Sequence, residues 1–129
     1  SCKLSRCVNH FSTASMEGPL HRELLHPGGI IVANSVESAR FLIESRIRDA
    51  ALGDAQARFD LGVAFSCGTG GVDVDLIEAH KWFNLAALAG SEEGQACRAE
   101  ISEEMTAREI AEAQRQARAW LFQIARRAA

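Results

Sequence analysis

The stretch of sequence that decides the fold is residues 54–90, DAQARFDLGVAFSCGTGGVDVDLIEAHKWFNLAALAG. Its first part begins with Asp54, a residue type that caps helix N-termini. Apolar residues then recur at helical spacing, at Ala57, Leu61, Ala64 and Phe65. The second part begins with the capping-box pair Asp75 and Glu78, and its apolar stripe is Ala79, Trp82, Phe83, Ala86 and Ala87. With the glycine-rich turn 66–71 between them, the two parts predict a pair of antiparallel helices.

Two further helices are predicted after this hairpin. Ser91 has the position of an N-cap, although Gly94 inside the helix that follows lowers helix stability by about 1 kcal/mol relative to alanine. Thr106 and Glu109 form another capping box ahead of a long last helix. The apolar stripe of that helix is Ile110, Ala113, Ala117, Trp120, Leu121 and Ile124. The chain is therefore predicted to be all-α, with about five helices.

One more helix is predicted before the hairpin. Asn34 is followed three residues later by Glu37, a pattern that predicts a helix N-terminus at this point. Residues 1–33 are then an arm, with at most a short extended segment at Ile30–Val32. Because the chain starts with Ser and Met16 has the position of a start residue, we expect residues 1–15 to be a processed or added leader. The helical domain is predicted to span residues 34–129.

The predicted helices also show signs of an internal repeat. Ala50-Ala51-Leu52-Gly53 lies 37 residues before Ala87-Leu88-Ala89-Gly90, and each run closes a predicted helix. This period is in the range of helical-hairpin repeats. Gly62, in the middle of a predicted helix, allows the close approach of a neighbouring helix.

On these residues the chain resembles the Sel1-like repeat family, a branch of the tetratricopeptide-like helical repeats. The resemblance is carried by small and aromatic residues at fixed positions over 54–90: Asp54-Ala55-Gln56-Ala57, Leu61-Gly62, Phe65, Gly68, Gly70-Gly71-Val72, Asp75, Ala79, Lys81-Trp82-Phe83, Ala86-Ala87 and Gly90. It extends less closely over 35–122, where the last helix is similar to the closing helix of bacterial members. The resemblance implies a short right-handed α-α superhelix with a C-terminal capping helix. It also implies protein-protein interaction, as a scaffold or adaptor, and no chemistry.

Composition excludes some classes of partner. The net charge is -3, from 14 Lys plus Arg against 17 Asp plus Glu, so the chain as a whole is repelled by nucleic-acid phosphates and anionic lipid. No apolar run has the roughly 20 residues needed to cross a bilayer, and the N-terminus does not have the pattern of a secretory signal. We therefore expect a soluble, cytoplasmic protein that binds neither nucleic acid nor membrane.

No pattern in the sequence predicts a catalytic or metal site. Cys2, Cys7 and His10 lie close enough in sequence to ligate one metal, with Cys67 as a candidate fourth ligand, but their irregular spacing is poor evidence for a zinc site. The cysteines do not have the pattern of a disulfide framework. Cys67 and Cys97 are expected to be small buried residues of the helical core. The glycines of 68–71 lack the preceding strand and following Lys-Ser/Thr of a phosphate-binding loop, so they indicate a turn. We predict no catalytic residue, metal or cofactor.

The function predicted from the sequence is a module that binds a partner protein or peptide on a concave helical surface. Helical phase makes four residues the candidates for partner contact: Gln56, Asp60, His80 and Asn84. His80 is expected to be solvated or to face the partner, because its own helix has no Ser or Cys with which it could form a catalytic pair. The alternatives are a self-associating structural module, such as a homodimer, a metal-binding protein or enzyme, and an arm at 16–33 that folds back into its own groove.

Overall fold

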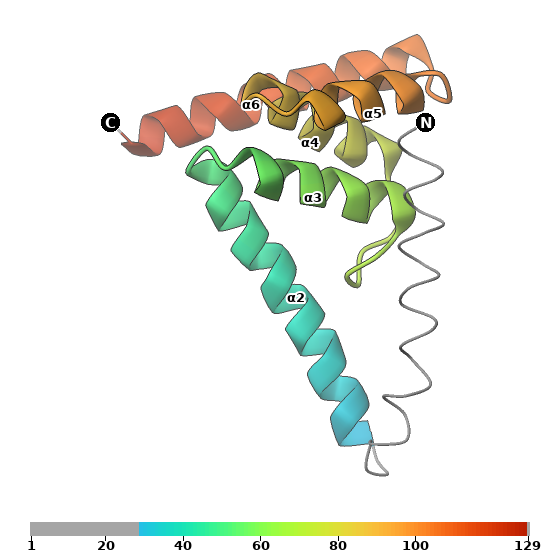
Figure 1. Cartoon of the computed structure of the whole chain (residues 1–129), viewed down its shortest axis with the longest axis vertical. Helices are drawn as coiled ribbons and strands as arrows, with labels where there is room; N and C mark the ends of the chain where they lie inside the picture. Colours follow the sequence, from blue (N-terminus) through green and yellow to red (C-terminus); the bar gives the residue numbers. More distant parts are fainter. Residues whose placement is uncertain (1–28, 129) are drawn as a thin grey trace.

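The computed structural model describes residues 29–128, with side chains from residue 38 onward. This part of the chain contains five α-helices and no strand (Figure 1), which confirms the prediction of an all-α fold. The helices are α2 (Gly29–Ala51), α3 (Ala55–Cys67), α4 (Leu76–Leu88), α5 (Glu92–Ser102) and α6 (Ala107–Ala128). Residues 1–28, with most of the predicted arm and leader, lie outside the described residues.

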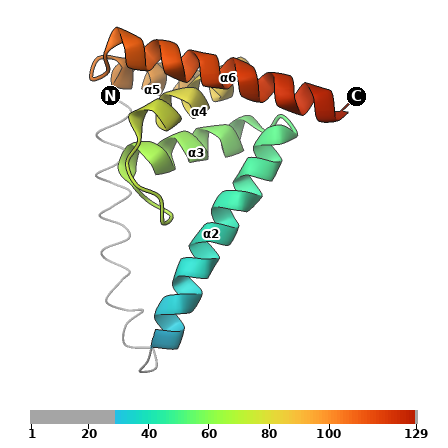
Figure 2. The same cartoon turned by 180° about the vertical axis from the view of Figure 1, so that it is seen from behind.

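The hairpin of α3 and α4 is the centre of the structure. α4 packs against α3, α5 and α6, and α2 contacts α3. Figures 1 and 2 show that α2 leaves the other helices at a steep angle, so that only its C-terminal end is packed closely against them. As a result, the N-terminal half of α2 stands apart from the layer that α3, α4 and α5 form.

The N-caps predicted from residue 54 onward are formed. The side chains of Asp54, Asp75 and Ser91 each accept a hydrogen bond from backbone N–H groups of the first turn that follows. Thr106 and Glu109 make both bonds of a capping box, at 2.9 and 3.1 Å. Asp75 is the exception to the predicted reciprocal pattern, because the carboxylate of its expected partner turns instead toward Lys81 and Trp82. The cap therefore depends on Asp75 alone.

The start of α2 differs from the prediction. The helix begins at Gly29 rather than after Asn34, so Ile30–Val32 are helical and not extended. The spacing of apolar residues explains this, because Val32 lies four residues before Val36 and continues the same helical period across Asn34. The glycine at the start of α2 ends that pattern, and Asn34 is an interior residue of the helix.

The core consists of two clusters of buried side chains on opposite sides of the α3–α4 hairpin. One contains Phe59, Ala79, Phe83, Ala86, Cys97, Ile101 and Met105. The other contains Ala50, Ala57, Leu61, Trp82, Leu85 and Ala117. Aromatic pairs lie in both, with ring centroids 5.6 Å apart for Phe59–Phe83 and 5.0 Å apart for Trp82–Trp120. Both helices are thus apolar on two faces.

Two buried glycines set how closely the helices approach. A Cβ atom at Gly62 would lie 2.5 Å from the ring of Phe83, so a larger residue on α3 would push α4 away. Gly94 has the same role on α5, since its Cβ would lie 2.9 Å from the Cβ of Ala86. The residue that weakens α5 as an isolated helix is therefore one that its packing requires.

A buried arginine on α3 joins the ends of its neighbours. Arg58 is 6% exposed. Its Nε donates to the carbonyl oxygen of Ala50 at 3.0 Å and its Nη1 to that of Leu85 at 2.9 Å. These carbonyls lie near the C-terminal ends of α2 and α4, where helices carry partial negative charge, and each also accepts a backbone N–H, from Gly53 and Ala89 respectively. The guanidinium also lies 5.3 Å from the ring centroid of Trp120 on α6. Burial lowers the pKa of Arg58 from its usual value.

We expect the substitution Gly62→Ala to destabilise the protein by about 1–3 kcal/mol, because the added methyl group overlaps the Phe83 ring. Urea unfolding followed by the fluorescence of Trp82 and Trp120 measures the change. At a helix position with room for a methyl group, glycine-to-alanine substitution raises stability instead. The exposed site Ala99→Gly is the control, with an expected loss of about 0.5–1 kcal/mol from backbone entropy alone. A Gly62→Ala protein as stable as the native chain would contradict the close packing.

Replacing Arg58 by alanine should lower the free energy of unfolding by about 2–4 kcal/mol. Two buried carbonyl groups lose a charged hydrogen-bond donor, and the Trp120 ring loses its contact with the guanidinium group. The same unfolding experiment measures this loss. Arg115→Ala is the control, since Arg115 pairs with Glu112 on the surface and contributes little. Equal stabilities of the two variants would show that Arg58 does not hold the helix ends.

Candidate functional site

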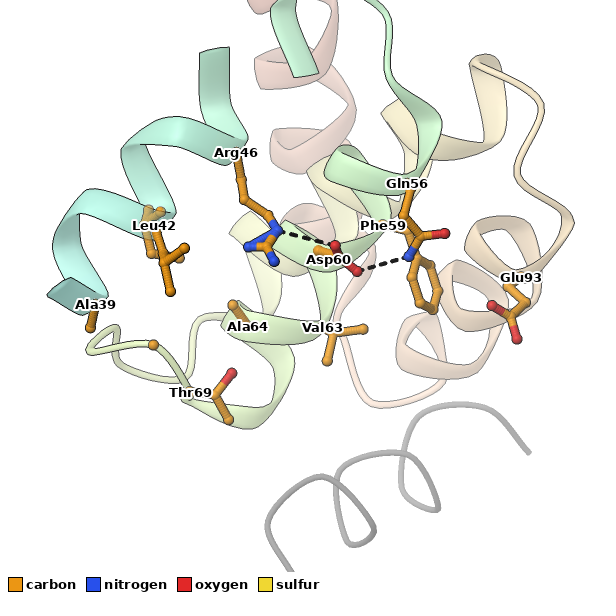
Figure 3. Close-up of a pocket in the computed structure, with 12 residues that line it drawn as sticks. Ala39, Leu42, Arg46, Gln56, Phe59, Asp60, Val63, Ala64, Thr69 and Glu93 are labelled. Atoms are coloured by element: carbon orange, nitrogen blue, oxygen red, sulfur yellow. Dashed lines mark hydrogen bonds and ion pairs between the residues drawn. The ribbon is translucent and has the colours of Figure 1, made fainter. Parts of the chain in front are cut away.

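A groove between α2 and α3 is a concave feature of the described residues. It has a volume of about 380 Å³ and extends from the middle of α2 to the turn after α3 and the start of α5 (Figure 3). Its lining residues are Ala39, Leu42, Ile43, Arg46, Gln56, Phe59, Asp60, Val63, Ala64, Thr69, Gly70 and Glu93. The turn at its end has positive φ at Gly68, Gly70 and Gly71, as its glycines predict.

The floor of the groove is apolar. Leu42 and Ile43 come from α2, and Val63 comes from α3, where it lies beside the core residue Phe59. Leu42 is 53% exposed, because α2 diverges from α3 and no other described element covers this part of it. The divergence of α2 therefore leaves apolar surface open along the groove.

The rim of the groove carries a chain of polar contacts centred on Asp60. One carboxylate oxygen accepts a hydrogen bond from Gln56 Nε2 at 2.9 Å, and the other accepts one from Arg46 Nε at 3.1 Å. Figure 3 shows all three side chains at the same edge. Among the described residues, the terminal guanidinium nitrogens of Arg46 make no further hydrogen bond. Asp60 thus fixes the arginine while leaving donors for a carbonyl or carboxylate of a ligand.

The structure separates the four predicted contact residues into two pairs. Gln56 and Asp60 line the groove. His80 and Asn84 do not, because they lie on the part of α4 that α5 covers. Asn84 Oδ1 accepts a hydrogen bond from Arg98 at 2.8 Å. His80 is 2% exposed, so the prediction that it is solvated or faces a partner is wrong. Helical phase identified a polar side of α4, but α5 packs on that side.

His80 forms a buried pair with a serine from another helix. Its Nε2 lies 3.1 Å from Oγ of Ser102 on α5. The Ser102 hydroxyl donates its proton to the carbonyl oxygen of Arg98 at 2.8 Å, so it must accept from a protonated Nε2 of His80. Nδ1 is then unprotonated, and it has no hydrogen-bond partner within the described structure. Burial, and then the charge of Arg98, lower the pKa of His80.

Within the part of the chain that the structure describes, this pair does not have the geometry of a catalytic Ser-His pair. The sequence argument found no serine on the helix of His80, whereas the fold supplies Ser102 from 22 residues away. The serine proton is directed to a backbone carbonyl, and burial closes the imidazole to a substrate. Among residues 29–128, no carboxylate orients the histidine through Nδ1. The pair instead joins α4 to α5.

The cysteines differ from the prediction. Cys97 is buried in the core, as expected, but Cys67 is only partly buried. Both residues are disulfide-bonded and not free thiols. The described residues contain no group of three possible metal ligands, and Cys2, Cys7 and His10 lie outside them. No helix in the described part of the chain is long and apolar enough to span a membrane.

Sequence reasoning missed Leu42, Arg46 and Val63 as groove residues. Val63 lies outside the stripe of Ala57, Leu61, Ala64 and Phe65, and an apolar residue on a second face of a helix is a signal that a further surface exists. No pattern in the sequence indicated Arg46 as a groove residue, because its contact with Asp60 depends on how α2 crosses α3.

No family model, curated protein or solved structure matches the chain in the comparisons made with known proteins.

The buried state of His80 predicts a loss of stability in acid. The folded protein holds the neutral form and the unfolded chain binds a proton near pH 6.5, so stability falls as the pH drops below about 6.5. The slope for this one group is at most about 1.4 kcal/mol per pH unit. Urea unfolding at pH 7.5, 6.5 and 5.5 measures it.

His80→Gln is the matched variant, because the glutamine amide can donate to Ser102 from the position of Nε2 and does not titrate. Other histidines contribute equally to both proteins. As the pH falls, the free energy of unfolding of the native chain should therefore decrease more than that of the variant. If the free energies of unfolding of the two proteins fell equally with pH, His80 would be protonated as easily in the folded protein as in the unfolded chain.

Proposed function

We propose that the chain is a protein-protein interaction module that binds a segment of a partner protein in the groove between α2 and α3. The observation that carries this proposal is the groove itself, with open apolar residues along its floor and a fixed arginine at its rim. Apolar anchors give affinity, while donors held in place give orientation and specificity. A helix or an extended segment with one apolar side and a carbonyl or carboxylate at its edge fits this surface.

We further propose that the helices are a fragment of a Sel1-like, right-handed α-α superhelix, with α6 as the capping helix. Two equivalent turns support the repeat. α2 and α4 are each followed by a glycine with positive φ, at Gly53 and Gly90, and then by an N-cap, at Asp54 and Ser91. The two glycines are 37 residues apart, the period expected for a helical-hairpin repeat.

In this proposal the groove performs no reaction and needs no cofactor. Its polar side chains are Arg46, Gln56, Asp60, Thr69 and Glu93, a set suited to hydrogen bonding and ion pairing. The partner is a protein rather than nucleic acid or membrane, since the net charge of -3 disfavours anionic polymers and lipid surfaces. We expect binding in the cytoplasm.

The double substitution Gln56→Arg, Asp60→Arg should abolish partner binding, because it adds positive charge to the rim and releases Arg46 from its position. Affinity capture from a lysate of the source organism, with the full chain as bait and quantitative mass spectrometry as readout, measures this. Proteins bound through the groove should fall at least about 10-fold, the change expected when one strong contact worth about 1.4 kcal/mol is lost.

The matched control is Glu103→Arg with Gln114→Arg, which makes the same change of charge at exposed positions away from the groove. This control should capture the same proteins as the native bait. If both double variants captured less partner protein by the same factor, binding would depend on the overall charge of the chain and not on the groove. If the groove variant captured its partners as well as the native bait, the interaction would lie on another surface, and the proposed function of the groove would be wrong.

A further inference from the structure

The two cysteines of the described helices are disulfide-bonded, and both lie beside the groove. Cys67 lies four residues after Val63 and eight after Phe59, so it continues the stripe of α3 that lines the groove floor (Figure 3). Cys97 packs in the same core cluster as Phe59, and it lies one helical turn after Glu93 at the edge of the groove. Both bonded sulfur atoms therefore lie on the floor side of the groove.

These two cysteines are too far apart to be bonded to each other. Cys97 packs against the middle of α4, where Phe83 belongs to the same core cluster. Cys67 lies beside the start of α4, because the N–H of Asp75 donates to the carbonyl oxygen of Phe65 at 2.9 Å. The eight residues from Asp75 to Phe83 span about 12 Å along a helix axis. The Cα atoms of a disulfide are at most about 7 Å apart, so each cysteine has a separate partner.

The sequence contains two further cysteines, and their spacing suits these positions. Cys2 and Cys7 are five residues apart, which is about 8 Å in a helix and at most about 18 Å in an extended chain. The segment that carries them is also long enough. The turn after α3 approaches α2 at Ala39, about 15 Å along the helix from its start at Gly29. The 22 residues between Cys7 and Gly29 span up to about 70 Å, so they can return to this turn.

We propose that Cys67 and Cys97 are each bonded to one member of the pair Cys2 and Cys7. Residues 1–28 then lie along the floor side of the groove and restrict access to it. This inference rests on the proposed function of the groove, and it makes binding there depend on redox state. A dithiol breaks each bond: it loses two electrons and two protons and becomes a disulfide, and the cystine becomes two thiols. Dithiols of a reducing cytoplasm therefore open the groove, and an oxidising disulfide closes it by the reverse exchange.

Mass spectrometry of the full chain tests the connectivity. The protein is purified without reductant, its free thiols are blocked with N-ethylmaleimide, and it is digested with trypsin without reduction. The cysteines then lie in four separate peptides, 1–3, 7–22, 59–81 and 82–98. We expect two linked pairs, each joining one of the first two peptides to one of the last two.

Four results would overturn the inference. They are a link between peptides 59–81 and 82–98, a link between peptides 1–3 and 7–22, alkylation of all four cysteines, and a covalent dimer on a non-reducing gel. Each of them means that the N-terminal cysteines are not bonded to the helices of the same molecule.

Access to the groove is measured with the apolar dye 8-anilinonaphthalene-1-sulfonate, which fluoresces when it binds apolar surface. Dithiothreitol should lower the apparent Kd of the native chain for this dye about 10-fold, as when a segment leaves a tenth of the grooves open. The variant Cys2→Ser, Cys7→Ser should bind the dye like the reduced native chain, with or without dithiothreitol. Ser1→Ala with Ser5→Ala is the matched control, which keeps both cysteines and should respond like the native chain.

A second substitution shows where the dye binds. Leu42→Glu, added to the serine variant, places a charge on the groove floor and should weaken dye binding about 10-fold, a loss of about 1.4 kcal/mol. Leu42 is 53% exposed, so the helices should remain folded, which far-UV circular dichroism checks. If dithiothreitol did not change dye binding, or if Leu42→Glu did not weaken it, the N-terminal segment would not control the groove.

The two proposals fail separately. If capture by the reduced bait depends on Gln56 and Asp60 but the peptides are not linked as expected, only this inference is wrong. If the peptides are linked as expected but capture does not depend on these two residues, the proposed function of the groove is wrong, and redox control of binding is wrong with it.

Discussion

The structure depends on a guanidinium group held away from water at the point where three helices end or cross. Arg58 on α3 satisfies carbonyl groups at the C-termini of α2 and α4 and lies over the indole of Trp120. Removing a charged group from water is costly unless its hydrogen bonds are replaced, and helix C-termini provide acceptors with partial negative charge. The carbonyl groups in the last turns of α2 and α4 thus become the partners of the buried charge, and one side chain contacts α2, α4 and α6.

The groove follows from how α2 is attached. The C-terminal end of α2 is held by Ala50, which is fully buried and whose carbonyl binds Arg58. By contrast, Gly62 and Gly94 allow α3 and α5 to approach α4 closely, at Phe83 and Ala86. α2 has only one strongly fixed end, so its axis can diverge from α3 and leave Leu42 exposed above Val63. Tight packing of the hairpin and an open groove beside it are two consequences of where the small residues lie.

Most of the helical architecture could be predicted, because caps and apolar periods are local properties. Asp54, Ser91 and Thr106 act within one turn of their own helix, so their positions in the sequence are sufficient. The contacts that could not be predicted join residues far apart in the sequence. Arg58 reaches a carbonyl 27 residues away, and His80 meets a serine 22 residues away. Neither has a periodic signal, since each depends on which face of a helix its neighbour covers.

The same distinction divides the candidate site. Gln56 and Asp60 are four residues apart on one helix, so their common face was predictable, and they do lie together in the groove. His80 and Asn84 have the same spacing on α4, yet α5 covers them. A polar face is therefore open only where no later helix packs on it, and in α3 that condition is met because α2 diverges. Surface available for binding is thus determined by the angle between helices, a property of the whole fold, while the residues that can use it are determined by local phase.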